Sequence, residues 1–213
     1  MNTRSKKTAP LRRRAEKPPK AGVNAKADSR RIEIVASACQ AIRKLGWRRA
    51  GMRQIAETAK ISPGSLYYYF KDKEELLFFC QELTLDALLE MVQAASLLPR
   101  VDSQLNYLIQ GHLKLLLDPR LAGPVHLEFD ELPPALYQKL VRKRDRYERA
   151  VREILEKGQT RGEIRAGDPK LQAFGLLGAL NWTARWYNHQ GPVPVSRVAE
   201  VFSEQLLGGL LDS

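Results

Sequence analysis

The sequence predicts an all-α fold, with an N-terminal domain of three helices followed by a larger helical domain. Apolar residues recur at helical spacing along most of the chain, and no segment alternates for long with the two-residue period of a strand. Helix start signals at Ser62-Pro63, Asp72 and Asp168-Pro169 separate the periodic segments. Short breaks between such segments are typical of a protein built from helices alone.

The segment 52–59 predicts a first short helix. Ile55, Ala56 and Ala59 lie at i, i+1 and i+4, which places them in one apolar stripe. Gly51 stands at the N-cap position, where glycine is acceptable but is not among the best capping residues. Ile61 breaks the spacing, so the helix is expected to end in a tight turn before it.

A second short helix is predicted to start at Ser62, because proline at the first helical position follows this capping residue. Leu66 and Phe70 lie at i and i+4 and are expected to face inward. The side chains left to point largely outward are Ser65, Tyr67, Tyr68 and Tyr69. Asp72 and Glu75 form a capping-box variant that starts the next, long helix.

Two short helices joined by a tight turn predict a helix-turn-helix that docks in the major groove of double-stranded DNA. Polar and tyrosine side chains on the exposed face suit phosphates and base edges. We expect Ser65 and Tyr69 to lie nearest the bases. The full set of expected DNA contacts is Arg53, Lys60, Ser62, Pro63, Gly64, Ser65, Tyr67, Tyr68, Tyr69 and Lys73. The alternative is a small helical bundle with no DNA function.

Residues 30–78 resemble the tetracycline-repressor (TetR) family of bacterial regulators. The resemblance is carried by Ile34, Ala38, Gly46, Ile55-Ala56, Ala59, Ile61-Ser62-Pro63-Gly64-Ser65-Leu66-Tyr67, Phe70, Lys73-Glu74 and Leu76-Leu77. It implies an all-helical homodimer with three N-terminal helices on DNA and about six further helices for a small molecule and the dimer interface. The chain departs from the family at Lys60, where a glycine is usual, and at Gly51, where a threonine often contacts phosphate. A lysine at positive φ costs on the order of 1 kcal/mol.

The positive charge is confined to the N-terminal part of the chain. The net charge is +11 overall, but residues 1–27 carry +8, residues 28–78 carry +4 and residues 79–213 carry −1. A basic N-terminal domain beside a nearly neutral C-terminal domain favours nucleic acid as the partner. The same partition argues against the alternative of a helical ligand-binding dimer that does not bind DNA.

Residues 1–27 are rich in Lys, Arg, Ala and Pro, so they are expected to form a disordered basic arm. Arg12-Arg13-Arg14 could contact a minor groove or phosphates, or the arm could be an inert solubilising tail. No segment has the length of a membrane span or the pattern of a signal peptide. Cys39 and Cys80 are expected to be buried thiols in a reducing cytoplasm, which makes a cytoplasmic protein the expectation.

The C-terminal domain is assigned to residues 79–213, after a DNA-binding domain at 28–78. Its predicted helices span 73–98, 102–117, a short irregular element at 119–131, 133–158, 169–189 and 194–211. The last two helices carry long apolar stripes and several glycines. We expect them to form an isologous four-helix dimer interface, and hence a palindromic DNA target. The interface residues are expected to include Phe174, Leu177, Val201, Phe202, Leu206 and Leu210. A purely intramolecular core is the alternative.

Trp182 and Trp186 lie at i and i+4 with Arg185 beside them. With Gly191-Pro192, the segment around them resembles the matching helix of TetR-family repressors of fatty-acid, aromatic and steroid breakdown, which implies an acyl-CoA effector. Tryptophans supply apolar walls and arginines hold phosphates. The expected effector residues are Asn181, Trp182, Arg185, Trp186, Arg142 and Arg146. The tryptophans could instead be packing residues, and the effector could be a hydrophobic drug or toxin.

No sequence pattern indicates catalysis. The chain has no Ser/His/acid constellation, no phosphate-binding glycine loop and no paired-histidine motif. His112, His126 and His189 are far apart, and neither cysteine has metal-ligand spacing, so no metal or cofactor is expected. We therefore expect a homodimeric DNA-binding repressor released by a small apolar ligand, and not an enzyme.

Overall fold

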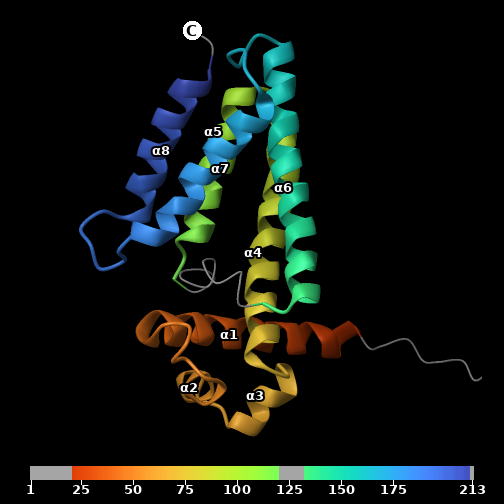
Figure 1. The fold of residues 1–213 in the computed structure, drawn as a ribbon, viewed down its shortest axis with the longest axis vertical. Coiled ribbons are helices and arrows are strands. Elements are labelled where there is room, and N and C mark those ends of the chain that lie inside the picture. The colour runs from red at the N-terminus through yellow and green to blue at the C-terminus, as the bar shows by residue number, and fades with distance from the viewer. Residues whose placement is uncertain (1–20, 120–131, 212–213) are drawn as a thin grey trace, which may run out of the picture.

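The computed structural model describes residues 21–119 and 132–211, which form eight helices (Figure 1). The helices are α1 (Ala21–Leu45), α2 (Met52–Thr58), α3 (Pro63–Tyr69), α4 (Lys73–Ser96), α5 (Val101–Leu116), α6 (Pro134–Thr160), α7 (Pro169–Trp186) and α8 (Val195–Leu210). Within these described ranges the extended structure is limited to one bridge between Ile164 and Leu211. The predicted all-α fold is confirmed.

Helices α1, α2 and α3 form a small domain at one end of the molecule, where α1 lies across the base of α4 (Figure 1). Its core contains Ile34, Ile55, Leu66 and Phe70, all at 1% exposure or less. The inward orientation predicted for Leu66 and Phe70 is therefore confirmed. Burying a large apolar side chain stabilises a fold by roughly 1.5–3 kcal/mol, so these few residues fix α3 on α2 and α1.

The predicted caps of this domain are present. The Ser62 Oγ accepts a hydrogen bond from the backbone N–H of Ser65 at 3.1 Å, and Pro63 occupies the first turn of α3. The Asp72 carboxylate accepts from the N–H of Glu75 at 2.7 Å, and the Glu75 carboxylate accepts from the N–H of Lys71 at 2.7 Å. Each cap satisfies N–H groups that a helix start leaves without an intrahelical partner.

The turn between α2 and α3 passes through Lys60, whose φ is +55°. It is the one non-glycine residue with positive φ in the described part of the chain. The backbone N–H of Lys60 donates to Glu57 at 3.2 Å, and that of Ile61 donates to Ala56 at 3.0 Å. The left-handed conformation predicted for this lysine is therefore confirmed.

Most helix limits lie within two residues of the prediction, and the larger differences are at the start of α1 and the end of α7. Helix α1 begins at Ala21, inside the stretch expected to be a disordered arm, because several alanines there have high helix propensity. Helix α7 ends at Trp186, three residues before the expected limit of 189, and Tyr187 is already extended. Residues 1–20, including the three successive arginines, and the expected helical element around 120–131 lie outside the described residues.

Helix α4 connects the two domains. It leaves the small domain and runs beside α6 along the long axis of the molecule (Figure 1). The Lys143 Nζ on α6 contacts the carboxylates of Glu82 at 2.9 Å and Asp86 at 2.6 Å, both on α4. These side chains are partly buried, and the ion pairs fix the register of α4 against α6.

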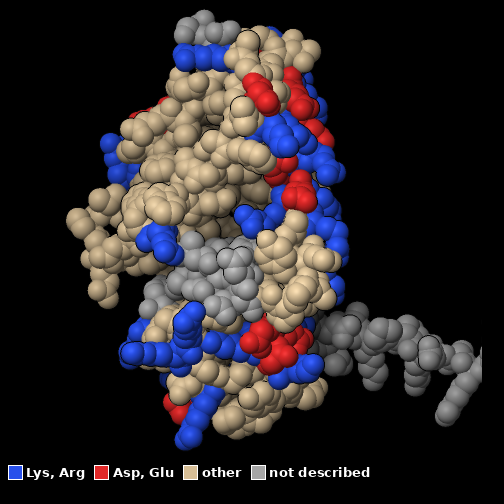
Figure 2. Space-filling view, viewed as in Figure 1, with Lys and Arg blue, Asp and Glu red and all other residues tan. Residues whose placement is uncertain are grey.

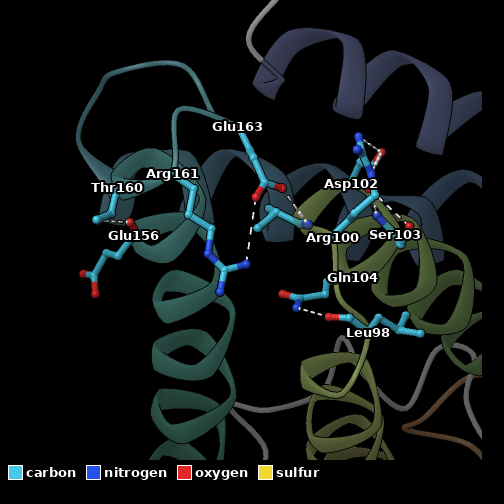
Figure 3. Close-up of polar contacts among 10 residues, drawn as sticks. Leu98, Arg100, Asp102, Ser103, Gln104, Glu156, Thr160, Arg161 and Glu163 are labelled. Carbon is cyan, nitrogen blue, oxygen red and sulfur yellow. Dashed lines mark hydrogen bonds and ion pairs between the residues drawn. The ribbon is translucent and has the colours of Figure 1, made fainter.

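The turns at the far end of the larger domain are joined by polar contacts (Figure 3). The Glu163 carboxylate accepts from the backbone N–H of Val101 at 3.0 Å, which satisfies the first turn of α5. The Gln104 amide donates to the carbonyl of Leu98 at 2.6 Å. A Cβ added at Gly158 would lie 2.4 Å from Ile164, so only glycine allows this close approach. Among the described residues, no helix is long and apolar enough to cross a membrane.

Candidate DNA-binding surface and ligand cavity

Helix α3 presents an exposed face at the end of the molecule. Tyr68 is 83% exposed and Tyr67 is 54% exposed, although tyrosine has a large apolar ring. Pro63, Gly64 and Ser65 at the start of the helix are also exposed. The Oγ atoms of Ser62 and Ser65 lie 2.8 Å apart, so these hydroxyls are oriented by each other. An aromatic and hydroxyl-bearing helix face of this kind suits phosphates and base edges.

Tyr69 does not share this exposure. It is half-buried, packs against the core, and meets Tyr68 edge-on with ring centroids 5.2 Å apart. The reason is the helical period, because Tyr69 lies at i+3 from Leu66 and next to Phe70 on the inward side. Tyr68, rather than Tyr69, therefore projects farthest from α3.

Figure 2 shows several basic side chains at this end of the molecule, together with a group of acidic ones. Arg53 on α2 and Lys60 in the turn are exposed, and the Arg53 guanidinium lies 3.4 Å from the carboxylate of Glu57. Lys73 has a different environment from the one expected of a DNA contact. Its Nζ donates to the backbone carbonyl of Trp47 and lies 3.8 Å from the centre of the Trp47 ring. Lys73 therefore joins the start of α4 to the turn that follows α1.

The larger domain contains a cavity of about 890 Å³ between α4, α5, α6 and α7. Its inner wall is formed by buried or half-buried apolar side chains, namely Leu85, Leu88, Leu116, Val141 and Leu177. The volume is within the range of pockets that hold drug-sized or cofactor-sized molecules. Because residues of α4 line it directly, a ligand here would contact the helix that leads to the small domain.

The inner wall also carries a polar cluster. The His112 Nδ1 lies 3.0 Å from the hydroxyl of Tyr147, and the His112 Nε2 lies 3.2 Å from the Oδ1 of Asn181. Burial lowers the pKa of His112 to about 4, against a smaller opposing effect of the Asn181 hydrogen bond. Burial also raises the pKa of Tyr147. Both side chains are therefore neutral at neutral pH.

The rim of the cavity is charged. Its basic residues are Arg144, Arg149, Arg152 and Lys170, and its acidic residues are Asp145 and Glu148. The excess of basic groups favours an anionic part of a ligand at the rim. Phe174 and Trp182, which are 50% and 64% exposed, add aromatic surface beside these charges.

The cavity includes two of the six expected effector residues, Asn181 and Trp182. Arg142 and Arg146 are exposed and lie outside the lining, because the helical period turns them past the edge of the α6 face that holds Arg144 and Tyr147. Arg185 is exposed and also lies outside the lining.

The second tryptophan of the α7 segment also lies away from the cavity. Trp186 packs against Phe202 of α8, with ring centroids 6.1 Å apart. The two tryptophans therefore do not line the same cavity within one chain.

The residues expected at a dimer interface fall into two groups. Phe174 and Leu177 on α7 line the cavity. Val201, Phe202, Leu206 and Leu210 on α8 are half-buried within one chain. Neutral side chains cover much of α7 and α8 in Figure 2. At Gly175, Gly208 and Gly209, which do not line the cavity, an added Cβ would meet no atom within 4 Å. This face is therefore open to close approach by another helix pair.

The sequence did not identify His112, nor the arginines that line the rim of the cavity, Arg144, Arg149 and Arg152. His112 stands inside the apolar stripe of α5 between Ile109 and Leu113, both fully buried. A polar residue within such a stripe must find a hydrogen-bond partner in the core. The position of His112 in the stripe therefore indicates a buried polar contact. Its partners lie on two other helices, so they could not be identified from spacing along one helix.

Two curated bacterial regulators have sequences similar to this chain over most of its length. The Fatty acid metabolism regulator protein of Bacillus subtilis (strain 168) is 25% identical over 183 residues, covering 84% of this chain and 94% of the relative. The HTH-type transcriptional repressor KstR2 of Mycolicibacterium smegmatis (strain ATCC 700084 / mc(2)155) is 27% identical over 199 residues, covering 87% and 92%.

Solved structures share the fold. The crystal structure of the TetR family regulator PfmR from Thermus thermophilus has a TM-score of 0.75 at 26% identity, covering 83% of this chain and 97% of that one. AibR, crystallised with isovaleryl coenzyme A and operator DNA, has a TM-score of 0.71 at 20% identity, covering 84% and 96%. At that identity the likeness to AibR shows the fold alone.

Two family models match the chain over most of its length. Residues 34–78 match the bacterial regulatory proteins of the tetR family. Residues 99–210, more than half of the chain, match the tetracyclin repressor-like C-terminal domain. Together with the exposed α3 and the cavity between α4 and α7, these matches place the chain among the transcriptional regulators. The chain belongs to the TetR family, whose members are DNA-binding regulators and not enzymes.

Proposed function

We propose that the chain is a homodimeric transcriptional repressor that binds a palindromic operator through α3 and is released by an acyl-CoA thioester. The observation that supports DNA binding most directly is the exposure of Tyr67 and Tyr68 on a short helix among basic side chains. Tyrosines kept out of the core in this way serve a partner surface rather than the stability of the chain.

The proposed DNA contacts are divided by position. Arg53, Lys60 and Ser62 lie around α3 and contact phosphate. Ser65 and the first two tyrosines contact base edges, with the exposed backbone at Pro63-Gly64 beside them. The half-buried Tyr69 supports Tyr68 from behind, and Lys73 supports the domain through Trp47.

Selection of bound genomic fragments by the purified protein tests the DNA function and supplies an operator. Tyr68→Ala is expected to weaken operator binding about tenfold or more, as loss of one base-edge contact does. Tyr107→Ala is the matched control, since Tyr107 is a 47% exposed tyrosine on α5. If the Tyr68 variant and wild type bind the operator with equal affinity, α3 is not part of the DNA interface.

The open face of α7 and α8 supports the homodimer. Leu171 is 65% exposed and Trp186 is 48% exposed on this side, and glycines there leave room for a facing helix. Paired helices from two copies would form a four-helix interface with two-fold symmetry, which matches a palindromic operator. Exposed apolar area of this kind is otherwise costly in water.

Gly175→Glu tests the dimer. An added Cβ at Gly175 meets no atom within 4 Å, so the fold of one chain accepts the change. Helix propensity even improves, by up to about 1 kcal/mol. Analytical ultracentrifugation is expected to show a shift towards monomer, while Gln138→Glu on the exposed side of α6 leaves the dimer intact. A dimer retained by the Gly175 variant would place the interface elsewhere.

The charged rim and apolar inner wall of the cavity support an acyl-CoA effector, which combines phosphates with an apolar chain. The 25% identity to a protein named Fatty acid metabolism regulator protein supports the same class. The ligand would shift the dimer towards a state that does not fit the operator. It can do so only through its differential affinity for the two states, and about 100-fold, roughly 2.7 kcal/mol, is sufficient.

Arg144 and Arg142 form a matched pair for testing this class. They lie two residues apart on α6, but only Arg144 lines the cavity. Titration calorimetry with hexanoyl-CoA is expected to show weaker binding for Arg144→Ala and unchanged binding for Arg142→Ala. No binding by wild type across acyl chain lengths would exclude acyl-CoA and favour an uncharged hydrophobic drug or toxin.

A further inference from the structure

Three helices bring one polar side chain each to the inner wall of the cavity. His112 of α5 lies between Tyr147 of α6, at 3.0 Å, and Asn181 of α7, at 3.2 Å. His112 is 2% exposed and Tyr147 is 5% exposed, whereas Asn181 is exposed and lines the cavity. All three side chains line the cavity, the first two buried and Asn181 exposed.

The geometry determines where the protons lie. The Asn181 Oδ1 can only accept, so the His112 Nε2 must carry the proton that it donates to Asn181. In a neutral imidazole the other nitrogen is then an acceptor, so the Tyr147 hydroxyl donates to the His112 Nδ1. The result is a directed chain of hydrogen bonds from Tyr147 through His112 to the carbonyl end of the Asn181 amide.

The other end of this amide is available. The Asn181 Nδ2 forms no hydrogen bond with any other residue that the structure describes. Its two N–H donors belong to a side chain that lines the cavity. Hydrogen bonds in a chain polarise one another, so an amide whose carbonyl already accepts is a better donor. Its fixed orientation also lowers the entropy lost when a ligand atom binds.

The rest of the cavity limits what that ligand atom can be. The cationic side chains of the lining, Arg144, Arg149, Arg152 and Lys170, are half-buried or exposed on α6 and at the start of α7. The buried groups of the lining are neutral, namely His112, Tyr147, Thr84 and apolar side chains, and the half-buried charge next to Tyr147 is the carboxylate of Glu148. A carboxylate or phosphate would be desolvated there without a charged partner, which is unfavourable. An uncharged oxygen acceptor fits.

We propose that Asn181 binds the carbonyl oxygen of the effector, and that His112 and Tyr147 are positioning residues that hold its amide. The inference rests on the proposed function, in which the effector is an acyl-CoA, so the carbonyl is that of the thioester. Anionic groups of the ligand lie at the basic rim, and the uncharged carbonyl lies at the neutral wall.

A pair of probes isolates the carbonyl. Hexanoyl-CoA and S-hexyl-CoA have the same nucleotide and the same chain length, but the thioether lacks the carbonyl oxygen. Titration calorimetry on the full-length protein is expected to show about tenfold tighter binding of the thioester. The thioether leaves the Asn181 amide without one hydrogen bond, and a loss of that kind costs about this factor in affinity. This comparison needs no variant, so it does not depend on the folding of a mutant.

Two variants then assign the effect. Asn181→Leu is expected to bind both probes with the affinity that wild type has for the thioether. Tyr147→Phe keeps the ring and removes the hydroxyl, so the preference for the thioester is expected to fall a few-fold while thioether binding is unchanged. A merely structural role of the cluster would change both affinities together. Operator binding of each variant serves as the control for folding.

The outcomes separate the two proposals. Equal binding of both probes by wild type, or an undiminished preference in Asn181→Leu, overturns the carbonyl contact and leaves the acyl-CoA effector intact. Failure of wild type to bind either probe overturns both. Tighter binding of the thioester that is lost with the Asn181 amide is the result expected from the structure.

Discussion

Lys73→Met distinguishes two roles for a lysine that the sequence assigned to DNA. In the structure its Nζ donates to the Trp47 carbonyl and lies 3.8 Å from the centre of the indole ring. A hydrogen bond from a charged group contributes about 1.5–3 kcal/mol and a cation–π contact about 0.5–1 kcal/mol. Lys73 is half-buried and methionine retains its apolar contacts, so we expect a net loss of about 2 kcal/mol.

The assay combines urea unfolding with the salt dependence of operator binding. At equal protein concentration, the unfolding midpoint of Lys73→Met should fall while the slope m is unchanged. The slope of log affinity against log salt should stay the same, because the ammonium does not neutralise a phosphate. Lys71→Met is the matched control, since Lys71 is exposed two residues earlier and its loss should leave stability unchanged.

The opposite pattern would refute this reasoning. A phosphate contact contributes about 0.9 to the salt slope, so two copies in a dimer contribute about 1.8. If Lys73→Met lowers the slope by that amount and unfolds at the same urea concentration as wild type, the lysine binds DNA and the contact with Trp47 is not important in solution.

Three other changes test the local chemistry. Lys60→Gly should stabilise the protein by up to about 1 kcal/mol, because Lys60 has a φ of +55°, and a lower melting temperature would contradict this. Asp72→Ala removes the cap of α4 and should cost about 1 kcal/mol by urea unfolding, whereas no loss would show that the cap is dispensable. His112 has a pKa of about 4 when folded and about 6.5 when unfolded, so the unfolded state binds more protons between these values and stability falls as pH falls. From about pH 7.5 to about pH 5 its contribution should decrease by about 2 kcal/mol, and a variant with His112→Gln should lose that part of the pH dependence.

Local signals in the sequence were sufficient for most of the helices and for the exposed face of α3. Ser62-Pro63 and Asp72 start α3 and α4 through hydrogen bonds that span only three residues. The positive φ of Lys60 was expected from the family resemblance, because a glycine is usual at that position of the turn. Features that depend on residues close in the chain are determined by caps, turns and the helical period.

The cavity was decided by the tertiary structure. His112 finds its partners 35 and 69 residues away, and Lys73 finds Trp47 26 residues away. Which arginines line the cavity depends on how α6 is rotated against α4, and the sequence favoured Arg142 where the packed helix presents Arg144. The physical reason is that a helical stripe fixes which residues share a face, while only the packing of several helices fixes what that face meets.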